Sequence, residues 1–525
     1  MQNDDGPASG KDDGATTAAR AGAPPQTSPS VSISSEFFFV CLFCLLAAMH
    51  VFIFSATFPL FNIVDELCHF DLVVKYSQNH VPRGLDSFSK ESLDYIVLYS
   101  TIEYCEDPTN FPDGRIPPPP WTQPMDQIRQ ALQAEEQMGS GKFNYEATQP
   151  PLYYELAGIW WRLGKVCGIH DGYLPYWLRF LNILVVCGLV WLGHWAARLV
   201  FPERPFVRLA VPALIAFMSQ SVFYSISNDV LSPVCYGLAF IALLYFWHAE
   251  TPDIRLGIFT GLALAAALLD KMTNLPMYAV SIGFIFWKIR ELAKARKLRP
   301  ALPSFAALFI CAGIPAAIWM AWCKSVYGDF TGSHLKADNY GWTLKPAAEW
   351  LHHPIFTPGG FWTFLSGNLS TFWQGEMIWH NKPMVLPGTG VFFTVFSLVA
   401  LAAALPALLP RSSNTIQLQR QALRLGLGGF VAGLAFSALL SVMYDFHDFY
   451  YPSRAFPYFT SGRLLLGSLI PVMLLLACGW DRLLDCYGNR VKFLTLVAFI
   501  SAMIIVEVAT DWSIFPNAYN WFHLP

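Results

Sequence analysis

The chain has 525 residues, of which 54% are hydrophobic and only 14% are charged, and its formal net charge is −3. Soluble domains carry about 25% charged residues, so this composition excludes an ordinary soluble protein and indicates an integral membrane protein. The slightly acidic balance offers no basic surface to a phosphate backbone, which excludes nucleic acid as a partner.

Residues 1–34 are rich in Gly, Ala, Ser, Pro and Asp and show no apolar period, which predicts a disordered cytoplasmic tail. The first apolar segment follows at about 36–60. It is too long and too far from the start for a cleaved signal peptide, so we expect it to remain as a membrane anchor. The rest of the chain, 35–525, would form one multi-span domain.

A membrane-spanning helix needs about 20 apolar residues. Eleven segments approach that length, which predicts an all-α fold of about eleven transmembrane helices in the lipid bilayer. They lie near 36–60, 177–197, 207–227, 230–248, 256–270, 274–290, 302–323, 387–409, 425–443, 463–480 and 492–510.

Lysine and arginine concentrate in four short connections, near 198–208, 288–299, 411–424 and 482–492. Positive residues favour the cytoplasmic side of a membrane. With eleven spans and a cytoplasmic N-terminus, all four connections are cytoplasmic, and we expect a multi-pass protein of the inner or plasma membrane. Three large loops are then extracytoplasmic, at 61–176, 324–386 and 444–462.

The apolar segment Leu152–Cys167 is short and contains Arg162 and Lys165. Counting it as a span would invert every later loop and place the basic connections outside. We therefore expect a short interfacial helix that lies on the membrane or dips into it.

Asp65 and Glu66 open the first extracytoplasmic loop, directly after the first span. Charge this close to a membrane is poorly solvated and is usually kept for function, so we predict both as catalytic residues. One carboxylate would take a proton from an acceptor hydroxyl, or the pair would bind a divalent cation such as Mg²⁺ or Mn²⁺. His69 shares a helical face with Asp65 and is a candidate substrate-binding residue. A solvated start to a loop helix is the alternative.

Two polar motifs stand at predicted extracytoplasmic helix ends. Gln149 and Tyr153 flank a Pro-Pro turn, which would begin a helix and direct their polar edges to the membrane surface. Asn228 and Asp229 follow Ser227 between two spans. Both pairs are candidate substrate-binding residues; a plain loop-to-helix junction and an N-cap are the respective alternatives.

Three cations are candidates for contact with a phosphate. Lys271 follows Asp270 at an extracytoplasmic turn, where an internal ion pair is the alternative. Arg454 lies in the last extracytoplasmic loop, and Arg463 opens the next span. Arginine holds phosphate with forked hydrogen bonds, although a snorkelling anchor would also explain Arg463.

Trp373 and Glu376 lie in the second extracytoplasmic loop. The Trp face would bind a sugar ring or an isoprenoid chain, and Glu376 would meet hydroxyl groups; an aromatic membrane anchor explains the Trp equally well. Cys68 and Cys105 both fall in the first loop, and whether they pair is open from the sequence.

Together these motifs resemble the GT-C superfamily of integral membrane glycosyltransferases, which includes protein O-mannosyltransferases and the lipid A aminoarabinose transferase. The closest likeness is to predicted bacterial multi-span proteins of unknown function allied to that superfamily. The resemblance extends over roughly residues 36–480 and rests on Asp65-Glu-Leu-Cys-His69, Gln149-Pro-Pro-Leu-Tyr-Tyr154, Ser227-Asn-Asp229, Lys271-Met-Thr273 and Gly462-Arg463.

The resemblance implies a polyprenyl-phosphate-linked sugar as donor and an extracytoplasmic glycan, lipid or protein as acceptor. It assigns Asp65 as the base and Glu66 as its support or a metal ligand. The reaction would be an inverting displacement, with Arg463, Lys271 or a cation beside the departing phosphate. A transporter or flippase of a lipid-linked glycan is the alternative, and it leaves the acidic pair without a role. A structural membrane subunit is a third class, in which the loop charges are replaceable.

Overall fold

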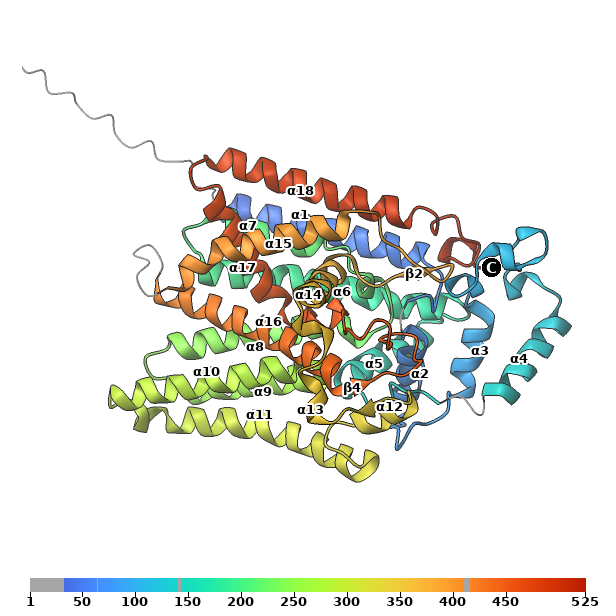
Figure 1. Ribbon diagram of the computed structural model, residues 1–525, viewed down its shortest axis with the longest axis horizontal. Coiled ribbons are helices and arrows are strands. Elements are labelled where there is room, and N and C mark those ends of the chain that lie inside the picture. The colour runs from blue at the N-terminus through green and yellow to red at the C-terminus, as the bar shows by residue number, and fades with distance from the viewer. Residues whose placement is uncertain (1–32, 64, 140–142, 410–415) are drawn as a thin grey trace, which may run out of the picture.

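The computed structural model describes residues 33–63, 65–139, 143–409 and 416–525, and these residues fold almost entirely into helices (Figure 1). Within them, eight helical segments are long and apolar enough to cross a membrane. The predicted all-α integral membrane fold is therefore confirmed. The helices of the bundle are α1 (Ile33–Thr57), α6 (Tyr173–Val200), α7 (Pro205–Ala216), α8 (Ser232–His248), α9 (Ile254–Asp270), α10 (Leu275–Lys294), α11 (Leu298–Tyr327), α15 (Thr389–Ala404), α16 (Gln417–Met443), α17 (Leu469–Leu483) and α18 (Asn489–Asp511).

Helices occupy all eleven predicted segments, but the prediction for 207–227 is wrong in extent. Helix α7 ends at Ala216, and the chain continues through a 3₁₀ turn at Ser221–Tyr224. A buried polar side chain accounts for this earlier end of the helix. Gln220 is fully buried and donates hydrogen bonds to the backbone carbonyls of Thr371 and Phe372. A buried amide needs such partners inside a membrane protein.

The predicted basic connections gather at one end of the bundle, on the left in Figure 1. Ion pairs tie this end together, including Arg204 to Asp481 at 2.7 Å and Lys492 to the same Asp481 at 2.7 Å. In the third connection, residues 411–415 lie outside the described part of the chain. We call this end the basic end.

The three large polar segments lie at the opposite end, which we call the cavity end (Figure 1). They contain α2 (Glu66–Ser77), α3 (Lys90–Tyr99), α4 (Met125–Gly139), α5 (Leu152–Val166), α12 (Ser333–Asn339), α13 (Ala347–Trp350) and α14 (Pro358–Gln374). Helix α5 is the helix expected at 152–167, and it packs on α2.

Two short antiparallel ladders join these polar segments. Strand β1 (Thr343–Leu344) pairs with β4 (Tyr444–Asp445), and β2 (Ile378–Trp379) pairs with β3 (Lys382–Pro383). The first ladder links the second polar segment to the third, so residues about a hundred positions apart meet at the cavity end.

The predicted N-terminal tail lies outside the described residues, except that Ile33 and Ser34 already belong to α1. The two loop cysteines do not pair. Cys68 is buried in α2 and Cys105 is exposed, and both thiols are free.

Candidate functional site

A cavity of about 1200 Å³ lies at the cavity end, beneath the polar segments. Its lining joins two kinds of surface. Four apolar residues, Phe436, Leu439, Leu440 and Met443, recur at the spacing of one helical face and come from α16; we call them the apolar wall. The polar lining comes from segments far apart in the chain: Asp65, His69, Glu146, Gln149, Lys271, Lys336, Glu376 and Arg463.

Asp65 stands at the N-terminus of α2 with φ of 64°, a left-handed conformation that Asp adopts more readily than most residues. Its Oδ2 accepts a hydrogen bond from Nη2 of Arg463 at 2.6 Å, and its Oδ1 accepts one from the Tyr145 hydroxyl at 2.7 Å. Burial alone raises the pKa of this carboxyl, but the cations Arg463 and Lys336 outweigh burial and hold the pKa well below its usual range. Asp65 is therefore an ionised carboxylate held on both oxygens.

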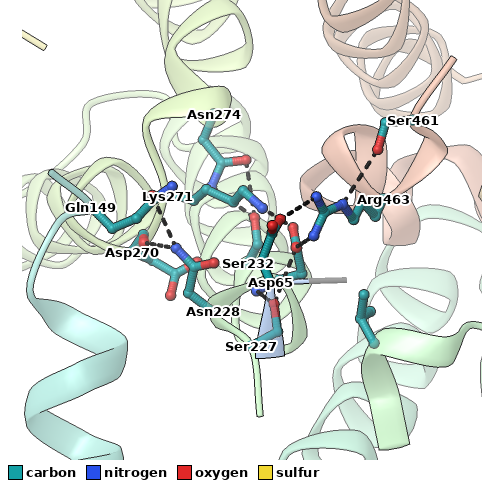
Figure 2. Close-up of polar contacts among 12 residues, drawn as sticks. Asp65, Gln149, Ser227, Asn228, Ser232, Asp270, Lys271, Asn274, Ser461 and Arg463 are labelled. Atoms are coloured by element: carbon teal, nitrogen blue, oxygen red, sulfur yellow. Dashed lines mark hydrogen bonds and ion pairs between the residues drawn. The ribbon is translucent and has the colours of Figure 1, made fainter. Parts of the chain in front are cut away.

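Lys271 and Arg463 meet at one buried carboxylate. Figure 2 shows their side chains reaching toward the same point from opposite sides. Lys271 forms an ion pair with Oδ1 of Asp229, and Nη1 of Arg463 lies 3.6 Å from Oδ2 of the same group. Asp229 is fully buried in a 3₁₀ turn that the side chain of Ser227 caps. Arg463 and Lys271, which the sequence predicts to approach one another at a phosphate site, therefore belong to one cluster.

Gly462 allows Arg463 to take its place. The backbone nitrogen of Gly462 donates a hydrogen bond to the Thr371 hydroxyl at 2.8 Å, which brings the start of the 3₁₀ helix Gly462–Ser468 against α14. A Cβ at this position would lie 2.1 Å from the backbone nitrogen of Phe372. Only glycine fits this close approach.

Glu376 completes the group around the guanidinium. Its Oε2 lies 3.6 Å from Nε of Arg463, and burial raises the pKa of its carboxyl. Its Oε1 is buried and has no hydrogen-bond partner among the described residues, and the same holds for Nε1 of Trp342, which also lines the cavity. We call Asp65, Asp229, Lys271, Glu376 and Arg463 the charged cluster.

Lys336 is a further cation in the lining that the sequence did not single out. It comes from α12 and forms an ion pair with Glu146, a carboxyl that is almost completely buried. Its ammonium lies 5.4 Å from the centre of the Tyr145 ring and 5.7 Å from that of Tyr340. Burial raises the pKa of Glu146, but Lys336 outweighs this effect and lowers it. The ion pair with Glu146 and the contacts of the ammonium with the two tyrosine rings hold α12 over the cavity.

Gln149 and His69 line the cavity and are held by residues behind them. Gln149 donates a hydrogen bond to Oε2 of Glu146 at 2.6 Å and accepts one from the Asn228 amide at 3.2 Å (Figure 2). Asn228 is not in the lining, so it acts on the cavity only through Gln149. The His69 ring is within 2.7 Å of the Tyr154 hydroxyl, and burial lowers the pKa of His69 to about 4.

Glu66 is not part of the cavity, so the structure does not place the predicted carboxylate pair in one site. Both of its oxygens accept hydrogen bonds from Arg179 at 2.7 Å, and both side chains are fully buried. Arg179 also donates to the carbonyls of Ser55, Phe58 and Pro59. Glu66 therefore ties α2 to α6 and to the end of α1. Asp65 precedes α2 with a left-handed φ of 64°, whereas Glu66 is the first residue of the helix, so the two neighbours face different directions.

Four other predicted substrate-binding residues lie outside the cavity lining: Asp229, which holds Lys271 from behind, and Trp373, Arg454 and Tyr153. Trp373 is buried, and its indole donates a hydrogen bond to the Ser397 hydroxyl at 2.8 Å, so it packs α14 on α15. Arg454 is exposed and pairs with Asp445 at 2.9 Å. Tyr153 is buried in the core. The sequence alone does not distinguish an aromatic or basic residue that packs in the core from one that faces water or binds a ligand.

The residues present do not fit the predicted metal site. Asp65 and Glu66 bind Arg463 and Arg179, respectively, rather than sharing a ligand position. Within the described ranges, no three His, Cys, Asp or Glu side chains are grouped so as to hold a metal ion.

The comparisons with known proteins agree with the multi-span fold. No curated protein matches the chain. Residues 48–444 match a family model described as predicted membrane protein (DUF2142). The matched range includes Asp65, Lys271 and Glu376 and ends before Arg463. Because the match spans well over half of the sequence, the chain belongs to the DUF2142 family of predicted membrane proteins.

Proposed function

We propose that the protein is a membrane glycosyltransferase that moves a sugar from a polyprenyl-phosphate donor to an extracytoplasmic glycan, lipid or protein acceptor. One observation carries the proposal: a single cavity of about 1200 Å³ is lined both by cations of the charged cluster and by the apolar wall. A phosphate ester of a long hydrocarbon needs both surfaces at once, because its headgroup requires charge-assisted hydrogen bonds and its tail requires burial from water.

Arg463 and Lys271 are the proposed phosphate ligands. Each stands where a helix of the bundle ends at the cavity, and this position supports their proposed contact with a lipid phosphate. The guanidinium offers a fork of donors to two phosphate oxygens, and the ammonium adds a point charge. Their shared contact with Asp229 fixes the two cations relative to each other.

Asp65 is the proposed base. In an inverting displacement the acceptor hydroxyl attacks the anomeric carbon while the bond from that carbon to the phosphate oxygen breaks. The carboxylate takes the hydroxyl proton, and the departing phosphate keeps the electron pair and is stabilised by the cations. One carboxylate is sufficient for a single displacement, which agrees with Glu66 serving the fold.

The test uses the full chain in lipid nanodiscs with a synthetic polyprenyl-phosphate sugar. We expect release of polyprenyl phosphate together with a glycosylated acceptor, and we expect polyprenyl phosphate among the lipids extracted from the purified protein. A protein that neither contains nor binds this lipid would overturn the proposal. Transport of the labelled lipid across a bilayer with its sugar–phosphate bond intact would instead identify a flippase.

A further inference from the structure

We propose that Arg463 is exchanged between two partners, so that the donor phosphate releases Asp65 by taking its guanidinium. This inference rests on the proposed function and adds an order of binding to it, in which the donor binds before the acceptor. In this structure Asp65 is engaged in an ion pair with Arg463, and in the proposed order the carboxylate becomes available to an acceptor only after a donor has bound.

The first observation is that the cations of the cavity are already engaged. Arg463 binds Asp65 at 2.6 Å, Lys271 pairs with Asp229, and Lys336 pairs with Glu146. An entering phosphate therefore finds each of these cations beside a carboxylate of the protein. Because like charges repel in a poorly solvated site, the phosphate competes with a carboxylate of the protein for each cation.

The second observation selects Arg463 as the cation that changes partner. Of its three carboxylate contacts, only the one to Asp65 is at hydrogen-bond distance, whereas the atoms of Asp229 and Glu376 lie 3.6 Å away. The guanidinium thus keeps donors for a forked contact with phosphate. Lys271, in contrast, pairs with a carboxylate that is completely buried.

The third observation concerns Asp65 after release. The Tyr145 hydroxyl donates to its other oxygen at 2.7 Å, and this contact does not involve Arg463. The carboxylate therefore stays at the N-terminus of α2 when the guanidinium leaves. Burial then acts without the neighbouring cation, which raises the pKa of Asp65 from its depressed value and makes the group a better proton acceptor. Tyr145 is a positioning residue in this scheme.

The experiment measures binding of undecaprenyl phosphate, which lacks a sugar, to the full chain in nanodiscs. Asp65→Asn removes the carboxylate that competes with the phosphate for Arg463. We therefore expect the variant to bind the lipid about tenfold more tightly than wild type, because the phosphate no longer has to replace one charge-assisted hydrogen bond. Asp65→Ala should tighten binding in the same direction, which guards against an effect peculiar to the amide. Glu250→Gln is the matched control, because it removes an exposed carboxylate that pairs with Lys297 at 2.8 Å at the basic end, outside the cavity lining; we expect a change below about threefold.

The exchange is overturned if folded Asp65→Asn and Asp65→Ala bind the lipid no more tightly than wild type, or if Glu250→Gln tightens binding equally. Arg463→Gln separates this failure from failure of the proposed function. Loss of lipid binding in Arg463→Gln without tightening in the Asp65 variants rejects only the exchange. Unchanged lipid binding in Arg463→Gln rejects the phosphate site itself. The unfolding temperature of each variant establishes that it is folded.

Discussion

Lys271 and Arg463 bind opposite oxygens of one carboxylate, that of Asp229, although they come from distant parts of the chain. Asp229 is fully buried, so it cannot turn to water when either cation moves. The shared carboxylate therefore acts as a fixed reference for two positive groups that would otherwise be flexible. This relationship gives the charged cluster its geometry, and the predictions below test the cluster and the helices that place it.

Replacing Asp65 by Asn should abolish most turnover while leaving the fold intact. The amide keeps the size of the side chain but cannot accept the acceptor's proton. We expect turnover to fall by about 10²–10⁴, the usual contribution of a general base. The measurement is the rate of sugar transfer by the variant in nanodiscs at saturating donor. A rate equal to that of wild type would remove Asp65 from the mechanism.

Replacing Glu66 by Ala should destabilise the protein. Removing one partner leaves the guanidinium of Arg179 buried without its counter-charge, which costs about 3–5 kcal/mol in comparable buried pairs. The measurement is unfolding in detergent. The matched control is Asp445→Ala, which breaks the exposed pair with Arg454 and should change stability little. Similar losses in both variants would contradict the structural role of Glu66.

Replacing Gly462 by Ala should displace Arg463. The added Cβ would lie 2.1 Å from the backbone of Phe372, so the 3₁₀ helix must shift away from α14. Overpacking of this kind costs about 1–3 kcal/mol, and we expect weaker binding of undecaprenyl phosphate as well. Gly283→Ala is the control, because a Cβ there meets nothing within 4 Å. Wild-type binding by Gly462→Ala would show that the close approach is not needed to place the guanidinium.

Lowering the pH should destabilise the protein through His69. Burial lowers its pKa from 6.5 to about 4, so the unfolded chain takes up a proton before the folded protein does. The stabilisation is complete above pH 6.5 and is lost as the pH falls from there toward 4. Between pH 7 and pH 5 the wild type should lose about 2 kcal/mol more than His69→Gln. Thermal unfolding of both proteins at the two pH values measures this difference, and equal losses would contradict it.

The two ends of the bundle should face opposite sides of the membrane. Arg299 lies in the first turn of α11, within a basic connection, and Lys382 begins β3 in the second polar segment. Reporter domains fused after these two residues should therefore report different compartments, with Arg299 in the cytoplasm. The same compartment for both fusions would contradict the proposed topology.

Sequence patterns predicted the helices and the cavity-facing Asp65, Lys271 and Arg463 because each charge stands at the end of an apolar segment, where charge is costly. They could not separate Asp65 from Glu66, since the choice depends on which face of α2 meets the bundle. The signal for that choice was present in Arg179, a charged residue inside an otherwise apolar helix.

Lys336 had no comparable signal. It lies in a polar stretch in which a lysine normally faces water, and it reaches the cavity only because α12 folds back over Glu146. Contacts of this kind depend on long-range packing, as does the burial of Trp373 between α14 and α15. Local periodicity carries no information about either position.

The ladder between β1 and β4 has a consequence for the motion of the cavity end. The ladder pairs Thr343 with Asp445 and Leu344 with Tyr444, and it joins the segments that carry the lining residues Trp342 and Tyr444. So short a ladder opens at little cost, whereas α17 is buried almost throughout its length. Amide hydrogen exchange should therefore be fast at this ladder and slow in α17. A bulky acceptor would then reach the charged cluster through transient opening of this ladder, while the bundle beneath it stays unchanged.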